Sequence, residues 1–170
     1  ETVHVDPKAF ASRQNRELWI SLLKRGKRVR THGSSDSHGP VSNRGLTAVY
    51  APRHHSKDIF RVVRSGDCVA GGVAIRMCVA DAVMGGSVAY APPGQTLLVS
   101  VDGFHPAHLQ DDTVYCLKVY TDRALAYARE FDGSAQTLAL PVEKRGYYRV
   151  EITNESDGLP VAFSNPIWLD

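Results

Sequence analysis

The hydrophobic period of this sequence changes between about residues 68 and 80, and that change limits what the chain can fold into. Before it, apolar residues recur three or four positions apart, as they do in amphipathic helices. After it, apolar and polar residues alternate in short segments separated by turn residues, which is the pattern of antiparallel strands. The sequence therefore predicts two parts of different construction, residues 1–70 and residues 71–170.

The first part is predicted to contain two helices and two strands. The first helix depends on the spacing of Leu18, Trp19, Leu22 and Leu23. Serine and asparagine provide candidate N-caps, at Ser12 or Asn15 for the first helix and at Ser56 for the second. The expected elements, in order, are a helix over residues 12–25, a strand over 29–34, a strand over 46–50 and a helix from Ser56 to Gly66.

The second part is predicted to be a β-sandwich of immunoglobulin-like size. About seven strands fit into roughly 100 residues, with no helical pattern between them. Alternation predicts groups of residues that share one face of a strand, namely Leu97, Val99 and Val101, then Tyr115, Leu117 and Val119, then Leu138, Leu140 and Val142, and finally Tyr148, Val150 and Ile152.

The loop Gly33-Ser34-Ser35-Asp36-Ser37-His38-Gly39-Pro40 carries the clearest chemical signal. Asp36 and His38 lie two apart just after a predicted strand, so in extended backbone their side chains point to the same side. A carboxylate and a neutral imidazole form a ligand pair suited to Zn²⁺, Mn²⁺ or Fe²⁺. The alternative is that Asp36 caps the turn and His38 is solvated. His54 and His55 are expected to be exposed rather than to bind metal.

Several segments together resemble the closing part of the PHP metal-dependent hydrolases, the polymerase and histidinol phosphatase superfamily. Leu18 to Gly26 resembles its helix ending in L-L-x-x-G, and Gly33 to His38 resembles its G-x-S-D-x-H loop. The helix ending at Gly66 and the stretch Ser164-Asn165-Pro166-Ile167 are similar to the branch with an appended C-terminal domain, the carbamate-ester-hydrolase-like branch.

This resemblance implies an α+β chain, in which residues 1–70 are the terminal β/α elements of an incomplete PHP-type β/α barrel and residues 71–170 are an immunoglobulin-like antiparallel β-sandwich. Asp36 and His38 would be metal ligands of a phosphoesterase or related ester hydrolase that holds divalent Zn, Mn or Fe. The family's opening His-x-His motif is absent from the sequence. The chain is therefore expected to be a C-terminal fragment that is inactive alone, contributes no catalytic residue beyond its metal ligands and pairs with the N-terminal remainder of the same protein.

Composition excludes some partners. The 20 Lys and Arg against 18 Asp and Glu give a net charge of +2, which does not favour nucleic acid as a partner. No apolar run is long enough for a membrane helix. Exposed apolar helix faces and unpaired strand edges predict homo-oligomerisation.

The competing hypothesis is a non-catalytic binding or assembly module whose sandwich binds carbohydrate or protein, with Asp36 and His38 incidental. The compartment is not predicted.

Overall fold

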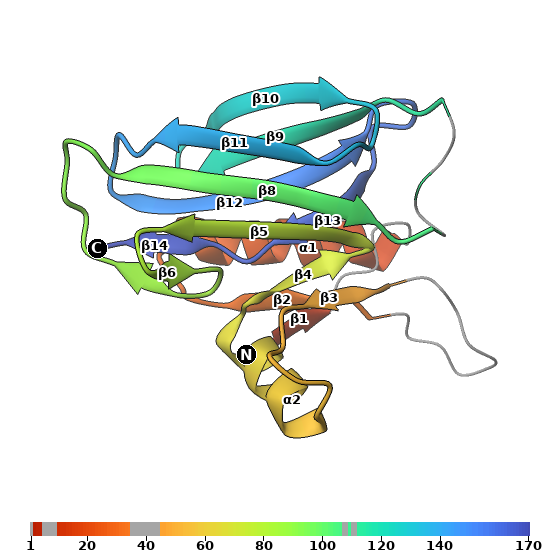
Figure 1. Cartoon of the computed structure of the whole chain (residues 1–170), viewed down its shortest axis with the longest axis horizontal. Coiled ribbons are helices and arrows are strands. Elements are labelled where there is room, and N and C mark those ends of the chain that lie inside the picture. Colours follow the sequence, from red (N-terminus) through yellow and green to blue (C-terminus); the bar gives the residue numbers. More distant parts are fainter. Residues whose placement is uncertain (1, 5–9, 35–44, 107–108, 110–111) are drawn as a thin grey trace.

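The computed structural model of the chain describes residues 2–4, 10–34, 45–106, 109 and 112–170. They form a β-sandwich, with helix α1 (Phe10–Lys24) along the outer face of the larger sheet and helix α2 (Ser56–Ser65) at one end (Figure 1). The strands are β1 (Thr2–His4), β2 (Arg30–His32), β3 (Thr47–Val49), β4 (Cys68–Gly71), β5 (Val73–Val79), β6 (Ala82–Val83), β7 (Ser87–Val88), β8 (Thr96–Phe104), β9 (Tyr115–Thr121), β10 (Leu125–Phe131), β11 (Gln136–Pro141), β12 (Gly146–Asn154), β13 (Pro160–Ser164) and β14 (Ile167–Leu169).

Two sheets enclose the main core. The larger sheet has the strand order β10-β9-β12-β13-β4-β3, and β14 joins it by pairing with β12 and β7. The smaller sheet has the order β11-β8-β5-β6. The strands β1 and β2 form a separate parallel pair with α1 between them in the chain. Within the described residues, no helix is both long and apolar enough to span a membrane.

The predicted alternation of core residues is confirmed. All twelve residues predicted to share a face in the four segments belong to the core between the sheets or pack against it. In β12, the inward-facing Tyr148, Val150 and Ile152 alternate with Tyr147, Arg149 and Glu151. These three outward-facing residues are also buried, because α1 covers that face of the sheet. The alternation in the sequence therefore predicted the face of β12 between the two sheets, but it did not predict that the opposite face is buried under α1.

The predicted fold class, an α+β chain with the terminal β/α elements of an incomplete PHP-type barrel, is wrong. The strand expected over residues 46–50 is β3, which pairs antiparallel with β4, and β4 pairs antiparallel with β13 in the larger sheet. Within the described residues, the parallel pairs are β1–β2 and β14–β7, and neither extends into a barrel. Residue 70, the end of the predicted first part, lies within β4.

The physical reason for this difference is that the apolar face of α1 already has a partner within the chain. Trp19 and Leu23 are fully buried against Tyr147 of β12 and Trp168 of β14. The indole of Trp19 donates a hydrogen bond to the carbonyl of Val29, at 3.1 Å, which ties α1 to the segment before β2. The helix thus covers the sandwich instead of a barrel sheet. It begins at residue 10, so Ser12 and Asn15 lie inside it and are not its caps.

Helix α2 begins at Ser56 and ends before Gly66, as predicted, and only its N-cap residue differs from the prediction. The N-cap position is His55 rather than Ser56, and the His55 side chain forms no capping hydrogen bond. Gly66 ends the helix in the left-handed conformation, with φ of 88°, and its N–H donates to the carbonyls of Val62 and Val63. Asp58 and Val62 provide its buried side.

Candidate functional site

Asp36 and His38, the predicted metal ligands, lie outside the described residues. The structure describes both ends of the segment that carries them, where β2 leads in through Gly33 and where Leu46 leads into β3. The contacts of these two ends define how the ligand segment is attached to the fold.

The two ends are joined directly by a threonine. The N–H of Gly33 donates to Oγ1 of Thr47 at 2.9 Å, and that hydroxyl donates to the carbonyl of Gly33 at 2.8 Å. The backbones approach so closely that a Cβ on Gly33 would lie 1.9 Å from the carbonyl oxygen of Leu46. Only glycine fits at this position, so close backbone packing explains why the G-x-S-D-x-H pattern begins with glycine in this chain.

A buried asparagine fixes the backbone of β2. The N–H of Thr31 donates to Oδ1 of Asn165 at 2.7 Å, and Nδ2 of Asn165 donates to the carbonyl of Thr31 at 2.8 Å. Nδ2 also donates to the carbonyl of Cys68 in β4, at 3.2 Å. Asn165 is fully buried, and we call its hydrogen bonds to Thr31 and Cys68 the Asn165 clamp. Through this clamp the C-terminal segment of the sandwich holds the strand that leads to Asp36.

The residues on both sides of Asn165 are tied into the sandwich as well. Ser164 Oγ accepts a hydrogen bond from the N–H of Val150 at 2.7 Å, and the carbonyl of Pro166 accepts one from the N–H of Gly85 at 2.9 Å. The Ser164-Asn165-Pro166 stretch, which the resemblance to the PHP family singled out, therefore has a structural role. It joins the larger sheet to β2.

The thiol of Cys68, which lies beside the Asn165 clamp, is expected to resist alkylation. Burial, followed by the nearby Asp67 carboxylate, raises the pKa of Cys68 to about 11. Because the thiolate is the reactive form, iodoacetamide at about pH 8 should modify the partly exposed Cys78 before Cys68 in the folded chain. Peptide mass spectrometry would measure both rates, with urea-unfolded chain as the control. Faster modification of Cys68 than of Cys78 in the folded chain would show that the Cys68 thiol is not protected by burial and a raised pKa.

The parallel pair adds one histidine that sequence reasoning did not select. His4 of β1 lies in register with His32 of β2, near the carboxyl ends of both strands. In parallel strands these ends meet at one edge, and the segment with Asp36 and His38 leaves β2 at that edge. His4 is therefore a further candidate ligand. The sequence offered only a histidine beside Thr2 and Val3, two residues of high strand propensity.

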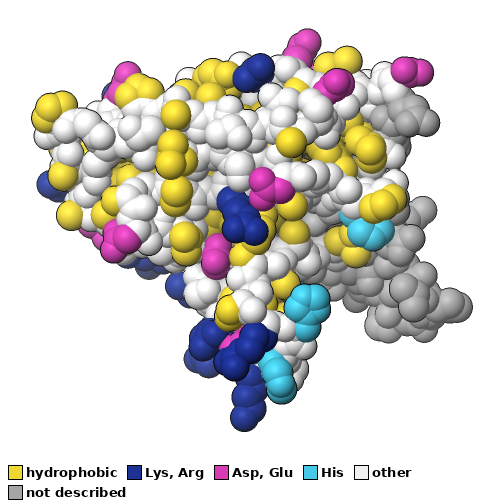
Figure 2. Space-filling view, viewed as in Figure 1, with side chains coloured by type: hydrophobic (Ala, Val, Ile, Leu, Met, Phe, Trp, Pro, Cys, Tyr) yellow, Lys and Arg dark blue, Asp and Glu magenta, His cyan; other side chains and the backbone are white. Residues whose placement is uncertain are grey.

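The pair His54 and His55 is exposed, as predicted, and its surroundings disfavour a cation. Figure 2 shows histidine side chains beside a group of Lys and Arg over α2. Lys57 and Arg53 are exposed in the same stretch, and like charges disfavour a bound metal there. Within the described residues, no group of three or more His, Cys, Asp or Glu is arranged to hold a metal ion.

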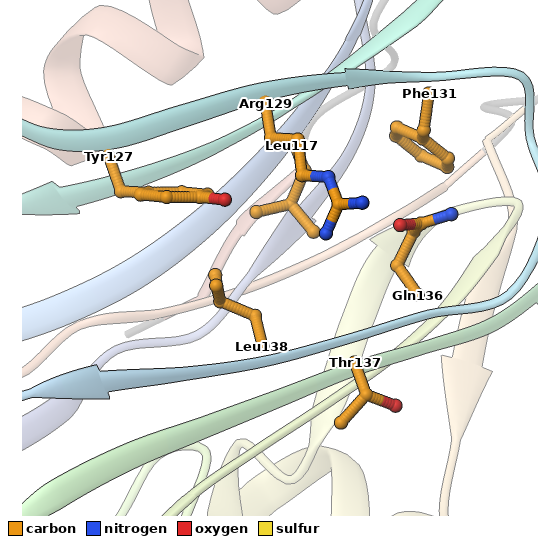
Figure 3. A pocket seen from close by; sticks show the side chains of 7 residues that line it. All are labelled: Leu117, Tyr127, Arg129, Phe131, Gln136, Thr137 and Leu138. Carbon is orange, nitrogen blue, oxygen red and sulfur yellow. The ribbon is translucent and has the colours of Figure 1, made fainter.

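The open side of the sandwich, between the edge strands β10 and β11, holds a small pocket and a larger one of about 300 Å³, whose lining includes Leu125, Leu140 and Lys144. Figure 3 shows side chains of β10, among them Tyr127 and Arg129, facing Gln136 and Leu138 of β11. The free space between them is about 10 Å³, roughly the size of one water molecule. The smaller pocket therefore has no room for a sugar ring or a peptide side chain. Four aromatic residues of the sandwich are buried and offer no exposed ligand platform, namely Tyr115, Tyr147, Tyr148 and Phe163.

Comparison with known proteins adds no assignment. The chain matches no family model, and it matches no curated protein. Conclusions about function therefore depend on the residues and geometry described above.

Proposed function

We propose that this chain is the C-terminal part of a PHP-type metal-dependent hydrolase, acting on a phosphoester or related ester, and that it contributes Asp36 and His38 as metal ligands. The remaining ligands would come from the N-terminal part of the same protein. The chain alone is then expected to bind metal weakly and to be inactive as a hydrolase.

The observation that carries this proposal is the anchoring of the ligand segment. A buried asparagine, a threonine bridge and a glycine close approach fix both ends of the segment on the sheet, and functional loops are typically held on a rigid scaffold in this way. Functional groups must be held within a fraction of an ångström by rigid supports. The Asn165 clamp and the Gly33–Thr47 contact are supports of this kind, and the strand register places residue His4 at the same edge.

The donor chemistry fits a divalent cation. Asp36 supplies a carboxylate, and His38 and His4 supply imidazoles, a mixed set suited to Zn²⁺, Mn²⁺ or Fe²⁺. A bound ion of this type lowers the pKa of a coordinated water and neutralises charge that develops on an ester oxygen. The described residues hold β2 in place and keep the two ends of the segment together through the contact between Gly33 and Thr47.

Paramagnetic relaxation measures this proposed site directly. Adding Mn²⁺ to the ¹⁵N-labelled chain is expected to broaden the amide signals of Gly33, Ser34 and Thr47 before those of distant strands such as β10. The reason is that relaxation by the metal falls steeply with distance from it. The Asp36→Ala/His38→Ala variant should lose the broadening, and His4→Ala should weaken it. Loss of two of three ligands is expected to raise the Mn²⁺ concentration needed by more than about tenfold.

The control is a second histidine pair on the same chain. His54→Ala/His55→Ala should broaden as the unmodified chain does, because that pair is exposed among cations. The proposal is wrong if Mn²⁺ broadens no signal near Gly33, or if the broadening survives the Asp36→Ala/His38→Ala substitution. Hydrolysis of an aryl phosphoester by the chain alone would contradict its expected inactivity.

The second candidate function is the non-catalytic binding or assembly module. The observation that favours it is that most of the described residues form a β-sandwich, an architecture common in binding domains. Absence of Mn²⁺ binding would leave this candidate as the better one.

A further inference from the structure

The larger pocket at the open side of the sandwich lies between two connections. One wall is the turn that joins β9 to β10, including Thr121 and Ala124, and the other is the segment between β11 and β12, including Lys144. Both connections lie at the end of the sandwich where β11 ends and β12 begins (Figure 1). The volume of about 300 Å³ is at the lower end of the range typical of small-molecule sites, about 300–1,000 Å³. We call this space the end pocket.

Hydrogen bonds hold both walls of the end pocket in place. In the β9–β10 turn, the N–H of Thr121 donates to the carbonyl of Ala124 at 2.9 Å, and the N–H of Ala124 donates to Oγ1 of Thr121 at 3.2 Å. On the opposite side, the carbonyl of Glu143 accepts a hydrogen bond from the hydroxyl of Tyr90 at 2.7 Å, and its N–H donates to the hydroxyl of Tyr148 at 3.2 Å. Because the backbone of both walls is fixed in advance, little ordering is needed when a ligand binds.

A β-bulge brings two consecutive residues of β10 to the wall of the end pocket. The pairing of β10 with β9 shifts in register between Leu125 and Tyr127, which places the bulge at Ala126. In a regular strand Leu125 and Ala126 would point to opposite faces, yet both line the pocket. Together with Leu140 of β11 they give the pocket an apolar side that suits a hydrocarbon group.

The charged groups of the end pocket favour an anion. Arg123 lies on the β9–β10 wall and Lys144 on the β11–β12 wall, and neither side chain has an ion-pair or hydrogen-bond partner within the described residues. Glu143 supplies the one carboxylate of the described lining, so the cations there exceed the carboxylates by one. The carboxylate of Asp122, the residue before Arg123, lies against Gly146 and outside the described lining.

Tyr148 adds a buried hydrogen-bond donor to the lining of the end pocket. The residue is 4% exposed, and its hydroxyl accepts the N–H of Glu143. A phenolic hydroxyl also donates one hydrogen, and no acceptor takes that hydrogen among the residues that the structure describes. The hydrogen is therefore available to an oxygen of a ligand in the pocket.

We infer that the end pocket binds a small organic carboxylate. Its hydrocarbon part would lie against Leu125, Ala126 and Leu140, and its carboxylate would lie between the side chains of Arg123 and Lys144. The excess of one cation fits a single negative charge better than the two charges of a phosphate monoester. This inference goes beyond the proposed function and does not depend on the metal site.

Titration of the ¹⁵N-labelled chain with hexanoate, followed by amide chemical shifts, tests the inference. The signals of Thr121, Ala124 and Glu143 are expected to move, because they belong to the walls of the end pocket. Hexanoate should bind at least about tenfold more tightly than hexanamide, which has the same chain without the charge. It should also bind at least about tenfold more tightly than acetate, which has the charge without the chain.

The variants separate the pocket from general attraction to a cationic surface. Arg123→Gln/Lys144→Gln should weaken hexanoate binding by at least about tenfold and leave hexanamide binding unchanged. The matched variant Lys57→Gln/Arg64→Gln removes two exposed cations from α2 and should bind hexanoate as the unmodified chain does.

Three results would overturn the inference. They are hexanoate that moves no signal of the pocket walls, equal affinity for hexanoate and hexanamide, and hexanoate binding that survives Arg123→Gln/Lys144→Gln. The titration contains no metal, and these variants leave Asp36 and His38 unchanged. Its outcome is therefore separate from that of the Mn²⁺ experiment, which tests the proposed function.

Discussion

Replacing Asn165 with alanine is expected to lower the free energy of unfolding by about 3 kcal/mol. The substitution removes three hydrogen bonds to the backbone and a longer one to the Cys68 sulfur, and leaves the N–H and carbonyl of Thr31 and the carbonyl of Cys68 without this partner. Thr31 and Asn165 are both buried, so water cannot replace the lost partner without opening the structure. Urea unfolding followed by tryptophan fluorescence would measure the change, because Trp19 and Trp168 lie in one buried cluster.

The adjacent serine provides a matched control for Asn165→Ala. Ser164→Ala removes one hydrogen bond, from the N–H of Val150, and should cost about 1 kcal/mol. Both residues are fully buried, so the comparison separates the bridging contacts of Asn165 from the general cost of a change at this place. If Asn165→Ala costs no more than Ser164→Ala, the clamp does not hold β2 as described.

The strands of the sandwich were predictable because a half-buried strand must alternate. Each strand places every second residue in the core, and Val99, Leu117 and Val150 follow that rule within their own segments. The helix α2 was equally local, since its buried side, its acidic first turn and Gly66 all lie within one short stretch. Properties of this kind depend on neighbours in sequence and are therefore visible in it.

The membership of strands in sheets was not predictable by the same reasoning. A helix followed by a strand is compatible with a barrel and with a sandwich that carries a covering helix. The choice depends on whether Trp19 and Leu23 find a partner, and that partner, Tyr147 with Trp168, comes from the other end of the chain. The Asn165 clamp also depends on residues far apart in the sequence, because Asn165 and its partner Thr31 are separated by 134 positions. The resemblance to the PHP family included Asn165 without indicating which groups it binds.

The candidate site was predictable only as residue types. Asp36 and His38 were selected by spacing and resemblance, and they lie outside the described residues. The contact between Gly33 and Thr47, which joins the two ends of their segment, depends on a close approach between two strands. His4 was missed because its position beside His32 follows from a parallel pairing across α1, which no local pattern announces.

Substituting Glu151 with alanine is the other change expected to have a large effect, about 4 kcal/mol of unfolding free energy. Arg16 of α1 donates to both carboxylate oxygens of Glu151, at 2.7 and 2.6 Å, and Arg149 donates to one of them at 3.0 Å. Glu151 and Arg149 are both at most 3% exposed. Removing the carboxylate would leave the Arg149 guanidinium buried without its counter-charge, and it would detach Arg16 from the sheet.

An exposed ion pair on the same sheet gives the control for Glu151→Ala. Glu155 accepts from Lys118 at 3.0 Å near the surface, and Glu155→Ala should cost under about 1 kcal/mol because solvent screens that pair. A double-mutant cycle of Arg16→Ala with Glu151→Ala, measured by urea unfolding, should give a coupling energy of about 2 kcal/mol. A coupling near zero would mean that α1 is held by Trp19 and Leu23 alone. A clear coupling would mean that the buried carboxylate also fixes where α1 sits on the larger sheet, since only one placement brings Arg16 to Glu151.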